Sequence, residues 1–528
     1  MKALKNNHLH YKGIYLFFLL AVIHGFSFSQ PPVNIDLNRD INSQYDYYLN
    51  ETSNTHSSIR PYVYSDIVRN DSSAGKISPP TILKNWNKET PHLHLELVPL
   101  LSLQPGYDVS HSNPVLETSA GVSLNGYYSD KIAFNLNVLA GNSSYVSYVD
   151  SNIKHTGVIP GSGPAYHSNL GYSYQNYSGY LSYSPDKVFN FQVGQGKHFF
   201  GDGYRSLFLS DVANNYPYAQ ITATIWKIKY VCLFAALKDA TSPTELPSNF
   251  QSKYGAFHYL SWNVTKRLNL NFFEAVIWEG TDSSRTRGYD INYLNPVVFY
   301  QPVQYSIGSP DNILMGLGFK LKAFQKQQFY GQLVVDEFNL DEILDHGGWW
   351  GNKQGIQLGF KSFDLFKIKS LVFQTEFNYV RPYTYSHLVV AQNYGDFNQP
   401  LADPLGANFI ESVSFLNYRR GRWTYELKFM AAVYGADENG FDYGQNIFES
   451  YSLVQLQGNI YGNYTTQGLR TKLLINDFRV AYLLVPAIHL KIEAGITERF
   501  QSSVEQTYST PFVYLGIRTL FGNFYTDY

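Results

Sequence analysis

The densest group of chemically capable side chains lies in the stretch "VDEFNLDEILDHGGWWGNKQG", residues 335–355. It combines several carboxylates and one imidazole with two adjacent tryptophans, Trp349 and Trp350. Flat aromatic faces beside carboxylates suit a sugar ring, but tryptophans at the rim of a membrane protein also act as interfacial anchors. The acidic spacing does not match an EF-hand loop, so we interpret the acids as a solvated loop and expect no metal site. Trp349 and Trp350 are therefore candidate glycan-binding residues.

A second candidate site lies in "NYVRPYTYSH", residues 378–387. A strand-like run precedes Arg381, Tyr383 and Tyr385. Glu376 lies in this run, on its polar side. A few convergent polar groups at the mouth of a cavity are typical of ligand sites, so these four residues could hold an acidic glycan. Ordinary charge balance along a pore wall is the alternative interpretation.

The usual signatures of catalysis are absent from the sequence, including GxSxG, HExxH and the P-loop. A phosphate cradle requires a helix directly after its glycine-rich loop. The glycine-rich "GQGKHFFGDG" (194–203) is expected to follow a strand with no helix after it, so we do not interpret it as a phosphate site. Cys232 is the only cysteine, which excludes an internal disulfide, and the net charge of −2 gives no sign of nucleic-acid binding. We expect a non-enzymatic protein without cofactors; an outer-membrane hydrolase is a less favoured alternative.

The N-terminus has the pattern of an export signal, because three lysines precede the apolar run "IYLFFLLAVI" and "FSFSQ" offers small residues for cleavage. The run of about ten residues is too short for a spanning helix, which needs about twenty. We expect residues 1–29 to be a signal peptide and the mature chain to begin at Gln30. Residues 30–92 are polar and allow a short helix through "DLNRDINSQYDYYLN". This segment is predicted to be a periplasmic extension or a plug.

The rest of the chain alternates apolar and polar residues with a period of two, as half-buried strands do. In "KIAFNLNVLAG" (131–141), one side carries Ile132, Phe134, Leu136 and Val138, and the other carries Ala133, Asn135 and Asn137. Such runs are about ten residues long, which is what a tilted strand needs to cross a bilayer. A soluble sandwich would alternate too, but its strands are usually shorter. We expect the apolar side to face lipid and the asparagines to face a polar lumen.

The connections alternate in length along the chain. Short turns are expected at 127–131, 184–187, 226–229, 265–267, 323–328, 363–369, 419–422 and 485–487. Longer polar stretches are expected near 104–120, 141–170, 197–218, 238–254, 279–312, 339–354, 381–408, 435–469 and 499–510. Roughly eight short and nine long connections imply about eighteen strands, with short turns on one rim and long loops on the other. We therefore predict an all-β, antiparallel transmembrane β-barrel over residues 93–528.

Two places fit this pattern less neatly. In "NLNFFEAVIW", Glu274 falls on the lipid-facing side, so either a bulge shifts the register or the strand has already left the membrane. The chain ends "FVYLGIRTLFGNFYTDY", where aromatic residues crowd the terminus. We expect a last strand that ends in aromatic residues for barrel-assembly machinery to recognise, although interfacial aromatic girdles would give the same enrichment.

Several long blocks beyond residue 90 are similar to a known family of outer-membrane proteins. They are "GDGYRSLFLSDVANNYPYAQI" (201–221), "FHYLSWNVTKRLNLNFFEAVIW" (257–278), "YLNPVVFYQPVQYSIGSPDN" (293–312), "DEFNLDEI" (336–343), "NYVRPYTYSH" (378–387) and "QPLADPLGANF" (399–409). They resemble the RemB gliding-motility family of the Bacteroidetes and, more loosely, the capsule-assembly Wzi family. The resemblance implies an eighteen-stranded barrel that retains polysaccharide at the cell surface, or contributes to gliding. It carries over no catalytic residues.

We therefore expect an outer-membrane barrel that binds or organises surface polysaccharide or adhesive components. Its expected partners are membrane lipid, capsule or exopolysaccharide, gliding or adhesin machinery, and the assembly machinery during biogenesis. An eighteen-stranded barrel is also wide enough for an aqueous channel, so a general or glycan-selective diffusion porin is the alternative. A lumen open to water would favour the porin, and a lumen closed by loops or by the N-terminal segment would favour the polysaccharide-binding barrel.

Overall fold

The computed structural model describes residues 32–51, 56–70, 88–89, 92–239, 250–281, 287–295, 311–337, 339–519 and 522–528. The expected signal peptide, residues 1–29, and its cleavage site lie outside these residues. None of the helices in the described part of the chain is both long and apolar enough to cross a membrane.

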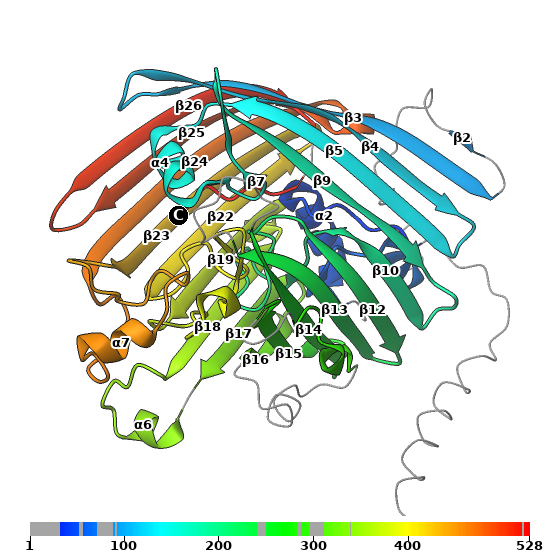
Figure 1. Ribbon diagram of the computed structural model, residues 1–528. Coiled ribbons are helices and arrows are strands. Elements are labelled where there is room, and N and C mark those ends of the chain that lie inside the picture. The colour runs from blue at the N-terminus through cyan, green and yellow to red at the C-terminus, as the bar shows by residue number, and fades with distance from the viewer. Residues whose placement is uncertain are drawn as a thin grey trace, which may run out of the picture.

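Eighteen antiparallel strands form a closed β-barrel, which confirms the predicted fold class (Figure 1). In chain order they are β3 (Leu93–Asp108), β4 (Asn113–Tyr128), β5 (Ile132–Ser143), β9 (Gly171–Tyr183), β10 (Phe189–Gly196), β12 (Tyr216–Ile225), β13 (Ile228–Asp239), β14 (Gln251–Asn263), β15 (Leu268–Glu279), β16 (Asn312–Ala323), β17 (Gln327–Glu337), β18 (Lys353–Phe363), β19 (Leu371–Val380), β22 (Phe409–Arg420), β23 (Trp423–Ala436), β24 (Leu469–Val485), β25 (Leu490–Ser502) and β26 (Thr507–Arg518). Each strand pairs with the next, and β26 pairs with β3 to close the ring. Closure leaves no unpaired sheet edge, as a hydrocarbon environment requires.

The two faces of the wall follow the predicted alternation. On β5, Leu136 is 52% exposed and Val138 is 37% exposed on the outer face. Asn135 and Asn137 face inward, where the Asn135 amide donates to Asn125 Oδ1 at 2.6 Å and the Asn137 amide donates to Ser178 Oγ at 3.0 Å. Apolar side chains therefore face outward and hydrogen-bonded polar side chains line the lumen.

The short turns on one rim agree with the sequence prediction, but two of the expected long loops are short. Strands β3 and β4 stay paired up to Asp108 and Asn113, and β25 and β26 stay paired up to Ser502 and Thr507. The stretches near 104–120 and 499–510 are therefore mostly strand. Pro105 lies between Gly106 and Leu103, which both pair with β26, and has no partner on that strand, so its missing N–H removes no bond of that ladder.

Glu274 keeps its outward parity, because β15 pairs with both neighbours without a register shift. The bulge considered for this strand is therefore wrong. The carboxylate is buried and lies 3.7 Å from Nδ1 of His258 on β14. Further along the same face, the Trp278 ring packs against Tyr289 and Tyr293, with a centroid distance of 4.9 Å to Tyr293. Residues 287–295 thus cover part of the outer wall.

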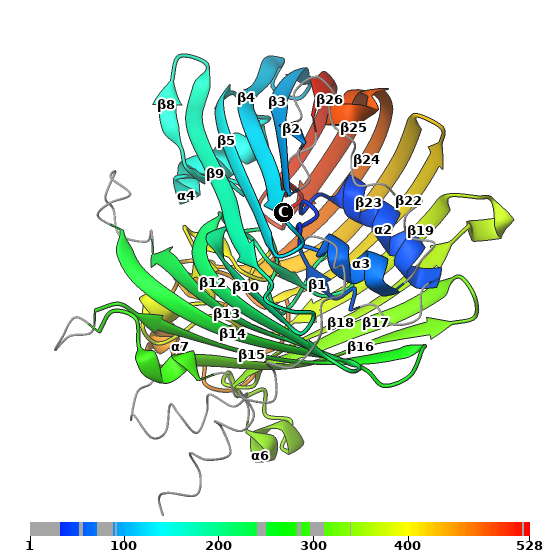
Figure 2. The ribbon, with the colours of Figure 1, turned by 90° about the vertical axis from the view of Figure 1, so that its right-hand side faces the viewer.

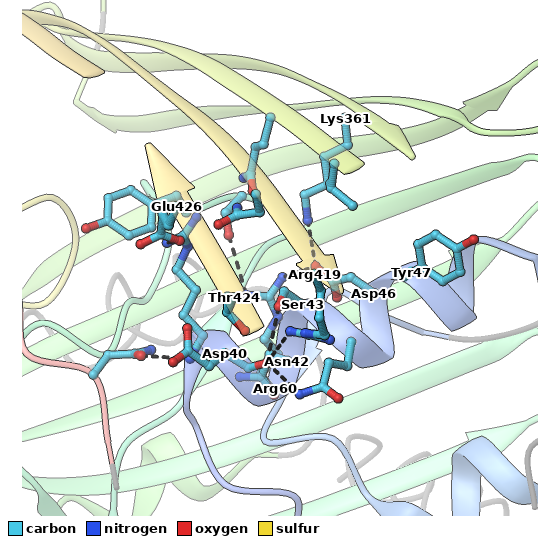
Figure 3. Close-up of a pocket in the computed structure, with 18 of the residues that line it drawn as sticks. Asp40, Asn42, Ser43, Asp46, Tyr47, Arg60, Lys361, Arg419, Thr424 and Glu426 are labelled. Atoms are coloured by element: carbon cyan, nitrogen blue, oxygen red, sulfur yellow. Dashed lines mark hydrogen bonds and ion pairs between the residues drawn. The ribbon is translucent and has the colours of Figure 1, made fainter. Parts of the chain in front are cut away.

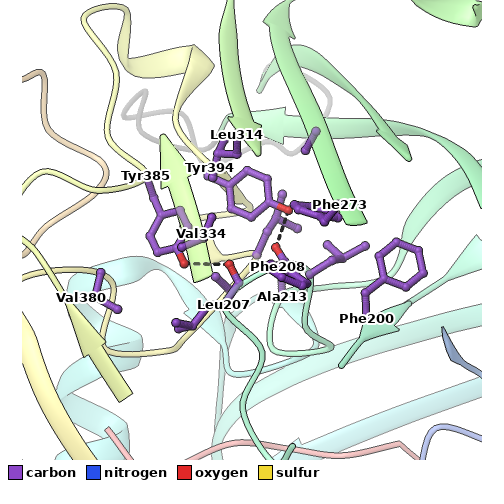
Figure 4. Close-up of a cluster of buried hydrophobic side chains, with 14 of the residues drawn as sticks. Phe200, Leu207, Phe208, Ala213, Phe273, Leu314, Val334, Val380, Tyr385 and Tyr394 are labelled. Atoms are coloured by element: carbon purple, nitrogen blue, oxygen red, sulfur yellow. Dashed lines mark hydrogen bonds between the residues drawn. The ribbon is translucent and has the colours of Figure 1, made fainter. Parts of the chain in front are cut away.

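Long connections fold into the barrel and form its main apolar core (Figure 4). The connection between β10 and β12 carries Leu207 and Phe208, and the Phe208 ring stacks on Phe273 of the wall at 4.9 Å. The connection between β19 and β22 contributes Tyr385 and Tyr394. Their hydroxyls donate to the carbonyl oxygens of Leu207 at 2.8 Å and Phe208 at 2.6 Å. Two connections far apart in the sequence are thereby joined inside the lumen.

The N-terminal segment contributes α2 (Arg39–Glu51) and α3 (Tyr64–Asn70), which lie within the ring of strands in Figure 2. Ile41, Tyr45 and Leu49 share the buried face of α2. A two-residue strand, β1 (Ile59–Arg60), pairs with β11 (Phe199–Phe200) of the inward-folded connection after β10. Residues 32–51 and 56–70 are therefore attached to the elements that fill the barrel, whereas β2 (Lys88–Glu89) pairs with β3 of the wall.

The C-terminal residues also turn into the lumen, and the end of the chain lies at its centre in Figure 2. Strand β26 ends at Arg518. The Tyr525 hydroxyl donates to Asp211 at 2.8 Å, and Arg499 donates to the main-chain oxygen of Tyr528 at 2.8 Å. Tyr525 and Tyr528 therefore belong to the filling of the barrel, and they are not the end of the last strand.

We predict that Leu136→Arg destabilises the folded barrel by about 2–4 kcal/mol, because it brings a cation to the lipid face. Asn137→Arg is the matched control on the adjacent residue, whose side chain lines an interior cavity of about 150 Å³. It should cost far less. Urea titration of the barrel in lipid vesicles measures both, and equal costs would mean that the two faces are assigned the wrong way round.

Candidate functional site

The tryptophan pair lies on the rim of long connections, in the segment between β17 and β18. Helix α6 (Leu340–Leu344) begins this segment, and the Asn339 side chain caps it by accepting a hydrogen bond from the Asp341 N–H. Trp350 is only 8% exposed and its ring meets Tyr451 at 4.7 Å. Trp349 is half-buried and meets Trp350 at 5.9 Å. Trp350 is therefore a packing residue, and Trp349 is the member of the pair that faces outward in part.

Arg381 supports the tryptophan segment from the next connection. Its guanidinium donates to the main-chain oxygen of Asn352 at 2.7 Å and to that of Trp349 at 3.4 Å. An arginine guanidinium has five N–H donors and no acceptor. Two of them bind the turn that carries Trp349. Arg381 thus has a positioning role here, which weakens the expectation that it supplies a free cation to an acidic glycan.

Tyr383 and Tyr385 are both fully buried and both have positive φ angles, of 65° and 74°. The Tyr383 ring meets Trp350 edge-on at 6.2 Å, and its hydroxyl donates to the main-chain oxygen of Asp442 at 3.1 Å. Tyr385 instead points into the lumen core, where it bonds to Leu207. Tyr383 therefore belongs to the tryptophan group and Tyr385 belongs to the filling of the barrel.

Glu376 belongs to a different, interior group. It accepts hydrogen bonds from the Arg205 N–H at 3.1 Å, from the Tyr330 hydroxyl at 2.6 Å and from the Tyr204 N–H. The Arg205 side chain, 1% exposed, forms ion pairs with Glu411 at 2.9 Å and Asp527 at 3.1 Å. Glu376 is thus an acceptor for an inward-folded segment. The structure brings together Trp349, Trp350, Arg381 and Tyr383, but not Tyr385 or Glu376.

Sequence reasoning missed two exposed aromatic residues on the same rim. Tyr461 is 58% exposed and Tyr464 is 63% exposed, and both lie between β23 and β24. Main-chain hydrogen bonds join this segment to the tryptophan segment: Gly462 N to Gly347 O at 2.8 Å, Asn463 N to Gly348 O at 2.9 Å, and Trp350 N to Ile460 O at 3.0 Å. We call residues 339–352 and 437–468 together the rim pair. The sequence signal that could have identified Tyr461 and Tyr464 is "IYGNY", in which two tyrosines flank a turn.

Three carboxylates of the rim pair, Asp437, Asp442 and Glu449, have oxygens within 4.8 Å of one another. Burial, followed by the charge of Glu449, raises the pKa of Asp437 to about 6; burial raises that of Asp442 to about 7. Their spacing would allow a shared cation. Main-chain N–H groups of Tyr443 and Gly444 donate to Asp437 and Asp442, so hydrogen bonds within the loop already stabilise both.

A cavity of about 240 Å³ lies beside α2, near the rim of short turns (Figure 3). Charged residues line it, and ion pairs join the helix to the wall. Asp40 lies 2.7 Å from Arg479 and 2.6 Å from Lys491, and Asp46 lies 2.7 Å from Lys361. Burial alone would raise the pKa of Asp46, but Lys361 and Arg60 lower it to about 2. These pairs hold α2 against the wall.

Comparison with known proteins identifies the fold. No protein-family model matches the chain, and no curated protein matches it by sequence. Among solved structures, it is similar to Wzi, an outer-membrane protein involved in group 1 capsule assembly in Escherichia coli and described as a carbohydrate-binding β-barrel. The TM-score is 0.59 at 11% identity, covering 93% of this chain and 100% of that chain.

Two Pseudomonas aeruginosa barrels are also similar. OprD gives a TM-score of 0.43 at 9% identity, covering 80% of this chain and 94% of that one. OccK1 gives a TM-score of 0.45 at 8% identity, covering 80% and 98%. At these identities the likeness concerns the fold, which is that of the outer-membrane β-barrels.

Proposed function

We propose that this chain is a non-enzymatic barrel of the cell outer membrane that binds or organises surface polysaccharide or adhesive components. The observation that carries the proposal is the filled lumen, because inward-folded connections, α2 and the C-terminal residues all occupy it. Two interior cavities measure about 240 and 290 Å³. A barrel of this size would otherwise enclose a water-filled channel. The likeness to a carbohydrate-binding barrel supports the same function.

We place the glycan contact on the rim pair, with Trp349 as the contacting side chain. Trp350 and Tyr383 pack beneath it, and Arg381 holds its turn through two main-chain oxygens. Tyr385 and Glu376 act at a distance from the ligand, because each binds an inward-folded segment that supports the rim. All six candidate residues then contribute to one surface, but Trp349 is the one of these six that touches sugar.

Export and assembly follow from the same proposal. Residues 1–29 direct the chain across the inner membrane and are removed, and the segment that follows serves as a plug through residues 32–51 and 56–70. Barrel-assembly machinery inserts residues 93–528 into outer-membrane lipid. The physical support is the ion pairing of Asp40 and Asp46 with wall residues, which a freely projecting periplasmic segment would not make.

By binding the polymer, the protein serves either capsule attachment or surface gliding. The resemblance to the RemB family favours gliding where the host has that machinery. A deletion strain scored for capsule retention and for spreading on agar separates the two roles. Loss of retention with normal spreading would assign the protein to capsule attachment, and loss of spreading alone would assign it to gliding.

We predict that Trp349→Ala weakens polysaccharide binding while the heat-modifiable migration of the barrel on gels stays normal, because Trp349 is half-buried and faces outward in part. Trp350→Ala should instead destabilise the rim by about 3–5 kcal/mol, since it empties a packed site. Trp226→Ala is the matched control, because Trp226 is 77% exposed on a short turn of the opposite rim. Equal binding losses in Trp226→Ala and Trp349→Ala would contradict the proposed contact.

We predict that the wild-type barrel is silent in planar bilayers, and that Asp40→Asn with Asp46→Asn produces openings by releasing α2 from the wall. Large steady openings of the wild-type protein would establish the alternative, a diffusion porin.

Acid should act in the same direction as these substitutions. Because the pKa of folded Asp46 is lowered to about 2, its stabilising contribution is present above the unfolded pKa of about 4 and is lost as the pH falls through about 2. Conductance recorded from neutral pH downward should stay low until that window. Opening near neutral pH would contradict this role of Asp46.

A further inference from the structure

We infer that the rim pair binds sugar units without acidic groups and discriminates against uronic acids and other anionic sugars. This inference rests on the proposed function and adds the chemical class of the ligand. The aromatic surface consists of Trp349, Tyr461 and Tyr464, on two segments that main-chain hydrogen bonds hold side by side. The charges around that surface carry the argument.

The charge of the rim pair has one sign. Residues 339–352 and 437–468 together contain seven Asp and Glu residues and no Lys or Arg. Asp341 and Asp345 are exposed, close in sequence to Trp349. Glu342 Oε1 accepts a hydrogen bond from the Tyr461 hydroxyl at 3.2 Å, so a carboxylate lies at the edge of an exposed aromatic ring. An anionic sugar on that ring would approach a fixed negative charge within the screening length of about 8 Å.

Three cations flank the rim pair, and only Lys353 is neutralised. Lys353 is fully buried, with its ammonium 3.7 Å from Asp336 and 3.4 Å from Glu337, and it lies 4.4 Å from the centre of the Tyr451 ring. Arg381 is half-buried and donates to the main-chain oxygens of Asn352 and Trp349, and Arg470 is exposed at the start of β24. The seven carboxylates of the rim pair outnumber these two cations, so a bound carboxylate would meet a net negative charge there.

The aromatic rings favour the opposite kind of ligand. Each ring face carries the negative end of a quadrupole, which attracts the weakly positive C–H face of a sugar and repels an anion. Tyrosine hydroxyls donate hydrogen bonds to sugar hydroxyls and accept hydrogen bonds from them without requiring charge on the ligand. The surface therefore combines an apolar stacking platform with acceptors, which suits an uncharged pyranose.

The test measures binding of the full-length barrel in detergent to immobilised alginate, polygalacturonate and hyaluronate. Each polymer is compared with its carboxyl-reduced, neutral form, and EDTA is present to remove bridging cations. We expect the neutral form of at least one pair to bind about tenfold more tightly than its acidic parent, a factor that corresponds to about 1.4 kcal/mol. The inference is overturned if every acidic parent that binds does so as tightly as its reduced form, or more tightly.

Two variants make the result specific to the rim. Glu342→Gln with Asp345→Asn should leave the affinity for the neutral form unchanged and raise the affinity for the acidic parent. The ratio between the two affinities then becomes smaller. Tyr461→Ala should weaken binding of the neutral form, while Phe324→Ala, at a residue 78% exposed on the opposite rim, should not. A preference unchanged by the charge variant would contradict the assigned cause. Absence of binding to every polymer would instead refute the proposed function, and this inference with it.

Discussion

Backbone hydrogen bonding is the constraint on which this structure depends. A strand in hydrocarbon has no water to bind its N–H and C=O groups, so the sheet must close on itself. Closure is completed where β26 pairs with β3, and the eighteen-stranded ring then fixes the two faces of every strand. Outward residues such as Leu136 are apolar because they face hydrocarbon, and inward residues such as Asn135 are polar and find polar partners in the lumen. The alternation seen in the sequence is the local form of this global requirement.

A ring of this size creates a second requirement, because its interior must be filled by water or by protein. Here the chain fills much of it with its own segments. Arg205 is central to this arrangement, since it joins an inward-folded connection to Glu411 on the wall and to Asp527 near the C-terminus. Its charge is 1% exposed and is balanced by carboxylates, as a buried cation must be. Beside it, Arg39 of α2 lies over the same Tyr204 ring as Arg205, and the acidic residues of α2 face wall cations. Interior ionic contacts thus take the place of much of the solvent of a pore, and the glycan contact that we propose lies on the rim.

The sequence was sufficient to predict the fold class, the strand count and the short turns, because each depends on a period of two or on local turn residues. It was not sufficient where pairing is non-local. β3 continues through Pro105 and Gly106, in the stretch near 104–120 that we expected to be a long loop, because β4 supports the other edge of the strand. Arg381 and Tyr383 lie in one group, but the partners of Arg381 are main-chain oxygens, which no side-chain pattern displays. Tyr461 lies more than a hundred residues from Trp349, and their segments are joined by main-chain hydrogen bonds between the loops and by the bond from the Tyr461 hydroxyl to Glu342.

The central claim is that the lumen is occupied by the ends of the chain itself. Replacing Asp40 and Arg479 with cysteines tests it most directly, because the charged ends of these two side chains lie 2.7 Å apart and one belongs to α2 while the other belongs to β24. Cysteine is much shorter than arginine, so a direct disulfide is not expected. The account predicts that a short bifunctional maleimide joins the two thiols in intact cell envelopes, in barrels that retain heat-modifiable migration. A folded barrel in which this cross-link does not form would contradict it.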